Sequence, residues 1–275
     1  MTHEQSSQNL PALDGWALIL GASSGFGEAA ALAFARAGMN VVGVHLDRRA
    51  TQENAERIVR QIEELGRTAW FFNVNAADQE RRREVLAEVT KRFDQRGKQE
   101  RFRVLMHSLA FGTLRPLVTD DPEEQATQKQ LEMTIDVMAN SLVYWTQDSY
   151  ASGLLGKNSR IFAMTSAGGS ASWKGYGAVS AAKCALESHI RQLACELGPV
   201  GISANSICAG VTDTPALRKI PQSARLIETA IRKNPMGRLT TPEDVAGALV
   251  ALSLPSTYWM TGNTIYIDGG EGHAG

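Results

Sequence analysis

The sequence predicts an α/β fold of one domain, in which a doubly wound sheet of seven parallel strands carries helices on both faces. Short apolar runs alternate with longer amphipathic stretches, as in repeated strand–helix units. A glycine-rich turn joins the first apolar run to an alanine-rich stretch. The chain has 275 residues, of which 43% are hydrophobic and 21% charged, so it is long enough for one sizeable core.

Seven apolar runs have the length and composition of buried parallel strands. We expect these strands over residues 16–20, 41–45, 68–72, 104–107, 160–165, 203–207 and 264–267. The stretches between them have helical periodicity, and right-handed crossovers place them on both faces of the sheet. We expect these helices over residues 26–37, 51–65, 78–93, 123–153, 174–198, 223–233 and 242–252.

The start of the last helix has the clearest signal. Thr241-Pro-Glu-Asp244 combines a capping residue with proline and acidic residues in the first turn. At the other end of the chain, residues 1–13 begin with a polar stretch that lacks the apolar core of a signal peptide. We therefore expect a flexible tail over 1–13 and a single domain over 14–275.

Two irregular segments follow strand ends and should border the ligand cleft. One is residues 112–124, and the other follows Gly210 and runs through Pro221. Ligands of parallel sheets bind beyond the carboxyl ends of the strands, where loops are free to carry function. We expect residues 211–233 to form a substrate lid.

The composition excludes several function classes. A net charge of −1 gives no general attraction to nucleic acid or to an anionic membrane. No apolar stretch approaches the length of a membrane span, and Cys184, Cys195 and Cys208 lack metal-ligand spacing. We therefore expect a cytoplasmic protein with no metal site, no nucleic-acid partner and no membrane partner.

The segment from Gly21 to Gly27 follows the first expected strand and opens a helix. Its glycines permit a tight turn and let the backbone approach a pyrophosphate, which rests at the positive end of the helix. Such a pattern is weak alone and strong at the first strand-to-helix junction, where it predicts a Rossmann-type dinucleotide site. The expected contacts are Gly21, Ser23, Ser24, Gly25, Phe26 and Gly27.

The residues at the end of the second strand determine whether NAD(H) or NADP(H) is bound. The usual acidic position falls on His45, whereas Arg48 and Arg49 are placed to bind a 2′-phosphate. These residues favour NADP(H). In the alternative, both arginines lie in solvent and Asp47 binds the ribose diol, so NAD(H) remains possible.

Further cofactor contacts are expected at the ends of the third and fourth strands. Asn73 and Val74 would flank the adenine, and the segment His107-Ser-Leu-Ala-Phe-Gly112 would meet the nicotinamide ribose. His107 itself is interpreted as a neutral core imidazole. The contacts expected from this segment are Ser108, Leu109 and Ala110.

Tyr176 and Lys183 are the candidate catalytic residues. Seven residues advance a helix by almost two full turns, so both side chains share one face and lie about 10 Å apart along the axis. Ser166 precedes them in a segment of small polar residues that could also form a simple turn. A tyrosine and a lysine at this spacing are common by chance, but their register with the glycine-rich turn and the strand ends favours a site.

With these residues in place, the chain resembles the short-chain dehydrogenase/reductase superfamily over nearly its whole length. Tyr-x6-Lys together with the His107 segment resembles the enoyl-acyl carrier protein reductases. The resemblance implies reduction of the trans-2 double bond of an enoyl thioester, as in fatty-acid synthesis, with NADPH or NADH. The matching landmarks are Gly21-x3-Gly25-x-Gly27, Asn73-Val74, His107-Ser-Leu-Ala, Ser166, Tyr176, Lys183, Ala209-Gly210, Thr214 and Tyr266-Ile-Asp-Gly-Gly270.

The resemblance also implies roles for single residues. Tyr176 would stabilise an enolate, Lys183 would hold the nicotinamide ribose, and Ser166 would add a polar contact. Gly210, Thr212 and Thr214 would meet the carboxamide or pyrophosphate end of the cofactor.

Several positions depart from the family patterns. Ser166 replaces the second tyrosine of many enoyl reductases and equally matches the serine of carbonyl reducers. Val179 stands where the tyrosine of carbonyl reducers would be. Met138 appears where many of them have asparagine, with Asn140 nearby on another face.

Two alternatives therefore stay open beside the enoyl reductase. One is a carbonyl reductase of the same superfamily, such as a 3-oxoacyl-acyl carrier protein reductase. The other is an NADP-sensing protein without catalysis. The resemblance implies an acyl thioester substrate on acyl carrier protein and a homotetramer.

Overall fold

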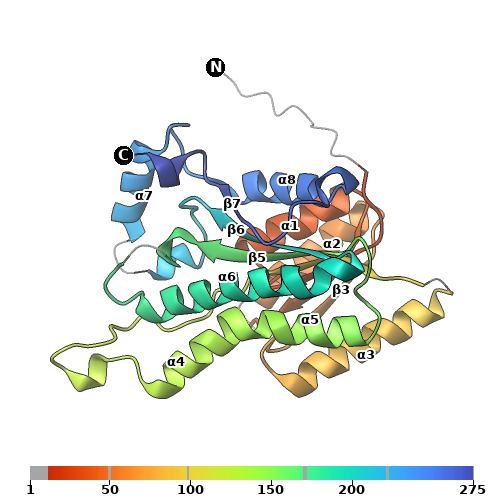
Figure 1. Cartoon of the computed structure of the whole chain (residues 1–275), viewed down its shortest axis with the longest axis horizontal. Coiled ribbons are helices and arrows are strands. Elements are labelled where there is room, and N and C mark those ends of the chain that lie inside the picture. The colour runs from red at the N-terminus through yellow and green to blue at the C-terminus, as the bar shows by residue number, and fades with distance from the viewer. Residues whose placement is uncertain (1–11, 49–50, 98, 170–171, 221–222, 275) are drawn as a thin grey trace.

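The computed structural model describes residues 12–274 except 49–50, 98, 170–171 and 221–222. Most of the tail expected over residues 1–13 lies outside the described residues, as does Arg49. Over the described ranges the chain forms one sheet with helices on both faces, as the sequence predicts (Figure 1).

The sheet has seven strands in the order β3-β2-β1-β4-β5-β6-β7, and every neighbouring pair is parallel. The order reverses between β1 and β4, which creates a crevice at the carboxyl ends of these strands. The strands agree closely with the expected ranges. They are β1 (Trp16–Leu20), β2 (Asn40–His45), β3 (Ala69–Asn73), β4 (Phe102–His107), β5 (Arg160–Ser166), β6 (Ser203–Ala209) and β7 (Thr264–Ile267).

Two layers of helices cover the sheet, and each buries its own hydrophobic cluster against it. One layer holds α1 (Gly25–Arg36), α2 (Gln52–Glu64) and α8 (Pro242–Leu252). The other holds α3 (Gln79–Gln95), α5 (Ser141–Ala151) and α6 (Gly177–Leu197), with α4 (Gln128–Ile135) leading into it (Figure 1). No helix within these described ranges is long and apolar enough to cross a membrane.

The expected helix over residues 123–153 is wrong in its start and its continuity. Pro122–Glu124 is a separate short turn, and α4 begins after Thr127, whose hydroxyl accepts from the backbone N–H of Gln130. The Gln130 side chain accepts in return from the Thr127 N–H, so this capping box fixes the helix start.

A π-helical turn, Asp136–Asn140, then separates α4 from α5. The Ser141 hydroxyl donates to the Val137 carbonyl at 2.7 Å, which satisfies a backbone group inside the widened turn. Hydrophobic periodicity continues through both elements, so the sequence pattern could not show the interruption.

The start of α6 also differs from expectation. The helix was expected from residue 174 but begins at Gly177, and Tyr176 occupies the capping position before it. The phenol therefore extends from the turn that precedes the helix. Residues 174 and 175 belong to that turn because Gly175 has a φ of 80°, which ends helical geometry there.

The predicted start of α8 is confirmed and gives a stability test. The Thr241 hydroxyl accepts from the Asp244 N–H at 3.2 Å, and an Asp244 oxygen accepts from the Thr241 N–H at 2.8 Å. We expect Thr241→Ala to lower the free energy of unfolding by about 1 kcal/mol, because it leaves a helix-end N–H without its acceptor. Urea unfolding would measure this, with Thr241→Ser as the control that keeps the hydroxyl. Equal losses in both variants would contradict a capping role.

Candidate active site

A cavity of about 340 Å³ lies at the carboxyl ends of the central strands. The glycine-rich turn after β1, the ends of β4, β5 and β6, the start of α6 and the segment after β6 all contribute to its walls. This is the place that the topology of a doubly wound sheet assigns to a ligand. Tyr176, Lys183 and Ser166 all line it.

The glycine-rich turn brings α1 directly against β1. A Cβ on Gly27 would lie 2.0 Å from the Gly21 carbonyl oxygen, so only glycine permits this approach. Ser24 precedes α1 without forming a side-chain cap, which leaves the first N–H groups of the helix available at the cavity. Ser24, Gly25 and Phe26 line the cavity, whereas Gly21 and Gly27 shape the turn behind it. The turn therefore fits the pyrophosphate of a dinucleotide.

The segment after β2 contains a paired histidine and aspartate. His45 is buried, and its Nδ1 lies 2.7 Å from an Asp47 carboxylate oxygen. Partial burial opposes ionisation of Asp47, but hydrogen bonds from Thr51, Ser23 and His45 outweigh it and hold the pKa of this carboxyl below its ordinary value. Arg48 next to this pair is exposed. The carboxylate of Asp47 thus lies two residues after His45, which occupies the usual acidic position at the end of β2.

The Asn73 side chain, at the end of β3, is hydrogen-bonded to the backbone of Asp47. Its side-chain oxygen accepts from the Asp47 N–H at 2.9 Å, and its side-chain nitrogen donates to the Asp47 carbonyl at 3.0 Å. The Val74 N–H donates to the His45 carbonyl. Asn73 and Val74 therefore tie the ends of β2 and β3 together, and neither lines the cavity.

The end of β4 supplies one wall of the cavity through Ser108, Leu109 and Ala110. His107 just before them is fully buried, and its Nε2 lies 2.9 Å from the Ser141 hydroxyl. Burial, and secondarily the charge of Lys183, lowers the pKa of His107 to about 3. The imidazole is therefore neutral, as the sequence analysis expected.

Lys183 is buried in the wall of the cavity, only 5% exposed. Its ammonium donates to the Met164 carbonyl at 2.8 Å and to the Leu109 carbonyl at 3.4 Å. Burial lowers the pKa of Lys183 to about 8, and the nearby Glu187 carboxylate only partly offsets this. The amine is thus fixed at the ends of β4 and β5 and titrates near neutral pH.

Tyr176 and Ser166 form the polar centre of the cavity. The Tyr176 hydroxyl donates to the Ser166 hydroxyl oxygen at 3.4 Å, and the Gly168 N–H donates to the same oxygen at 3.1 Å. Burial raises the pKa of Tyr176, and the contact with Ser166 only partly opposes this shift. The phenol is therefore protonated at neutral pH and able to donate a hydrogen bond to a ligand oxygen.

The surroundings of Tyr176 are apolar where carbonyl reducers have polar groups. Val179 and Met138 both line the cavity and pack with Tyr176 in one hydrophobic cluster. Asn140 lies elsewhere and contacts His189, with 3.1 Å between the amide oxygen and the ring nitrogen. The departures noticed in the sequence thus fall in the wall of the cavity.

The segment after β6 covers the cavity. Gly210, Thr212 and Thr214 line it, and a Cβ on Gly25 would lie 3.6 Å from Thr214, which places the two sides of the predicted phosphate site face to face. The short turn Leu217–Lys219 and α7 (Ser223–Lys233) follow. Ile220 and Leu226 in this region also line the cavity.

Sequence reasoning missed several lining residues. Trp173, Cys208 and Glu271 all face the cavity. Trp173 could have been predicted from the sequence, because it lies only three residues before Tyr176. Glu271 gave no such signal, because it reaches the cavity only through a turn in which its carboxylate accepts from the Val211 N–H at 3.0 Å.

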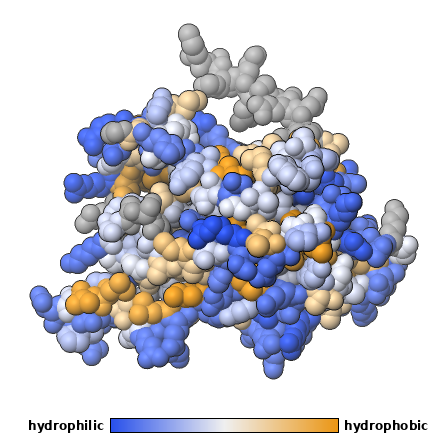
Figure 2. Space-filling model, in the orientation of Figure 1, coloured by the Kyte–Doolittle hydropathy of each residue, from blue (hydrophilic) through white to orange (hydrophobic). Residues whose placement is uncertain are grey.

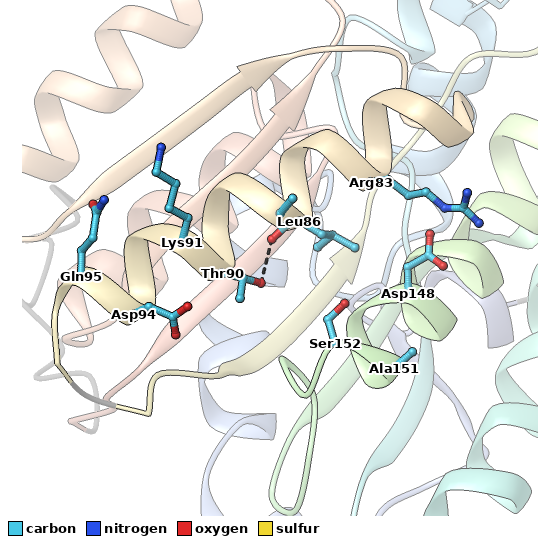
Figure 3. A pocket seen from close by; sticks show the side chains of 10 residues that line it. Arg83, Leu86, Thr90, Lys91, Asp94, Gln95, Asp148, Ala151 and Ser152 are labelled. Atoms are coloured by element: carbon cyan, nitrogen blue, oxygen red, sulfur yellow. Dashed lines mark hydrogen bonds between the residues drawn. The ribbon is translucent and has the colours of Figure 1, made fainter.

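A second hollow lies between α3 and α5 (Figure 3). It shares no lining residue with the cavity at the carboxyl ends of the strands. Arg83 and Asp148 lie at one end, whereas Lys91 and Gln95 point away from α5. Apart from buried Leu86, its side chains are exposed or half-buried surface groups, and it contains none of the candidate catalytic residues. The cavity beyond the strand ends is therefore the candidate active site.

Comparisons with known proteins agree with this geometry. The family described as "Enoyl-(Acyl carrier protein) reductase" matches residues 21–271. A 3-oxoacyl-[acyl-carrier-protein] reductase from Thermotoga maritima is 27% identical over 253 residues, which are 92% of this chain and 96% of that protein. A cyclohexanol dehydrogenase from a Rhodococcus species is 27% identical over 280 residues, covering 96% of this chain and 98% of the relative.

Solved structures show the same fold. A dehydrogenase/reductase from Sinorhizobium meliloti superposes with a TM-score of 0.80 at 25% identity, over 96% of this chain and 97% of that chain. A short-chain dehydrogenase from Burkholderia cenocepacia, solved in complex with NADP, gives 0.79 at 25% identity, over 96% of this chain and 99% of that chain. With the family match covering most of its length, the chain belongs to this family of the short-chain dehydrogenase/reductase superfamily and is an oxidoreductase.

Proposed function

We propose that the protein reduces the trans-2 double bond of an enoyl thioester with NADPH. The observation that carries this proposal is the placement of Tyr176 in the cavity with Val179, not a tyrosine, four residues before Lys183. In conjugate reduction, negative charge develops on a thioester oxygen three bonds from the carbon that receives hydride, which is two bonds further away than in carbonyl reduction. The Tyr176 phenol comes three residues before the Val179 position and is therefore further from Lys183 in sequence, which suits that more distant oxygen.

In this proposal the side chains of the cavity have separate roles in the reaction. A nicotinamide cofactor bound here supplies hydride for the β-carbon of the substrate. Tyr176 donates a hydrogen bond to the thioester oxygen and so stabilises the enolate, and a proton taken up from solvent at the α-carbon after hydride transfer completes the reduction. Lys183 holds the ribose hydroxyls and stabilises the developing negative charge. Ser166 adds a second polar contact, and the lid over 211–233 excludes water.

A second function is favoured by specific observations. Ser166 contacts the Tyr176 hydroxyl, as expected if it polarises a ketone, and the Thermotoga maritima relative is a 3-oxoacyl reductase. Carbonyl reduction on the same thioester class is therefore the alternative. In either case we propose an acyl group carried by acyl carrier protein and a homotetrameric assembly. A cofactor sensor without catalysis is the third possibility.

Turnover of matched trans-2-enoyl and 3-oxoacyl thioesters would distinguish these functions. Consumption of NADPH, followed by absorbance, should be faster with the enoyl substrate. Tyr176→Phe should reduce kcat by a factor of about 100 to 1000, because it removes the donor to the developing oxyanion, while NADPH still binds. Turnover of the 3-oxoacyl substrate alone would support the carbonyl reductase. Cofactor binding without turnover of either substrate would support the sensor.

Lys183 should make cofactor binding depend on pH. Its charged form donates to the ribose hydroxyls, and burial holds its pKa at about 8. NADPH affinity should therefore fall as pH rises through this value, since the ammonium then loses its proton. A fluorescence titration on both sides of pH 8 would measure the change.

Two variants serve as controls for this pH dependence. Lys183→Met should bind NADPH weakly at every pH. Lys174→Met, which removes an exposed amine close to Tyr176 in sequence, should keep the dependence of the parent protein. The same fall in affinity in Lys183→Met would contradict the assignment.

We propose that Arg48 selects NADP(H) by binding the 2′-phosphate. Arg48 is exposed beside the adenosine end of the site, and Asp47 is turned toward Thr51 and His45. Loss of a charge-assisted hydrogen bond in Arg48→Glu should weaken NADPH binding about tenfold or more and leave NADH binding little changed. Arg67→Glu makes the same charge change just before β3, at the amino ends of the strands and thus away from the carboxyl ends that Arg48 follows. Unchanged NADPH affinity in Arg48→Glu would support the Asp47 alternative and NADH.

A further inference from the structure

Trp173 lies beside Tyr176 in the turn that leads into α6. The two ring centroids are 5.3 Å apart and the rings are nearly perpendicular, at 77°. The Tyr176 N–H donates to the Trp173 carbonyl, so a tight turn connects the two residues through the backbone as well. Edge-to-face contact of this kind favours one orientation of the phenol.

Gly168 provides the surface on which both rings rest. A Cβ at this position would lie 2.4 Å from Cε1 of Tyr176 and 2.6 Å from Cζ3 of Trp173. Any side chain at residue 168 would therefore push both rings out of place. The close approach to bare backbone means that the Trp173 ring has a defined position, although it is close to solvent.

The two rings differ in exposure. Tyr176 is 8% exposed, whereas Trp173 is 41% exposed and still lines the cavity. An indole that faces a cavity and is only partly covered by protein offers apolar surface to a ligand. The pair thus places a polar hydroxyl inside the cavity and a large apolar surface nearer to its mouth.

Apolar residues from two other segments border the same cavity. Leu114 follows β4, and Ile220 and Leu226 belong to the region after β6. Leu117 covers the start of α6, since a Cβ on Gly177 would lie 2.8 Å from it. Figure 2 shows apolar side chains gathered at the lower left of the molecule, over the segment that leads into α4. A ligand whose reacting end meets Tyr176 therefore passes apolar walls on its way to solvent.

We propose that Trp173 is a specificity-determining residue for the acyl chain, whose methylene groups pack against its indole ring beyond the reacting thioester. The same ring supports the orientation of the Tyr176 phenol. This inference rests on the proposed acyl thioester substrate, but it holds for an enoyl or a 3-oxoacyl group alike. It predicts that Trp173 matters more for long chains than for short ones, because burial energy grows with each methylene.

Binding of saturated thioesters tests the contact without catalysis. Dodecanoyl-CoA and butyryl-CoA would be titrated into the NADPH complex while tryptophan fluorescence is followed. The chain has five tryptophans, so the signal of Trp173 is obtained as the difference between the parent protein and Trp173→Phe. Dodecanoyl-CoA should change the fluorescence of the parent protein and of Trp259→Phe, a control at an 83% exposed position, but not of Trp173→Phe.

Steady-state kinetics gives the second measurement. Trp173→Ala should raise the KM for a dodecenoyl thioester about tenfold, the equivalent of about two methylene contacts, with a smaller effect on crotonyl thioester. Trp173→Phe should have a KM for the dodecenoyl thioester close to that of the parent protein. In both variants the Kd for NADPH should stay that of the parent protein.

The two kinds of failure can be told apart. An unchanged ratio of the two KM values in Trp173→Ala, together with the same fluorescence change in Trp173→Phe, would overturn the inference and leave enoyl reduction intact. Fluorescence changes with dodecanoyl-CoA in a protein that does not reduce enoyl thioesters would instead refute the proposed reaction and support the role of Trp173.

Discussion

The hydrogen bonds of the buried Lys183 ammonium are the interactions on which the candidate active-site cavity depends. A charge removed from water is costly unless hydrogen-bond acceptors replace the water. The carbonyl oxygens of Met164 and Leu109 serve this purpose, and they belong to the end of β5 and to the segment directly after β4. One side chain therefore ties α6 to two neighbouring strands. With α6 fixed, helix geometry directs Val179 into the same cavity, and Tyr176 precedes it at the helix start.

The same burial acts on Tyr176 and Lys183 in opposite directions. Exclusion of water disfavours the charged form of each group, so it raises the pKa of the phenol and lowers that of the amine. At neutral pH the phenol keeps its proton for a hydrogen bond, and the amine is mostly protonated because its pKa is about 8. Val179 and Met138 are part of this apolar environment, since both pack in one buried hydrophobic cluster with Tyr176. The chemistry proposed for the site thus follows from the burial of Tyr176 and Lys183 as well as from their side-chain types.

One wall of the cavity is assembled from segments that lie far apart in the sequence. The Glu271 carboxylate accepts from the Val211 N–H, and the Asn234 side chain donates to the Asp268 carbonyl at 2.9 Å. These bonds join the segment after β6, the end of α7 and the turn after β7. Such contacts give the proposed lid a defined position against the C-terminal turn.

The sequence by itself determined the order of the elements, the strand positions and the glycine-rich turn, because apolar strand composition and glycine spacing are local properties. It also indicated Tyr176, Lys183 and Ser166 through their register with that turn. Tertiary structure decided the break between α4 and α5, the pairing of Asn73 with the Asp47 backbone, and the position of Glu271 at the cavity. These features depend on which segments lie alongside one another, since a polar group takes whichever partner the packed chain brings within reach. No local pattern in the sequence contains that information.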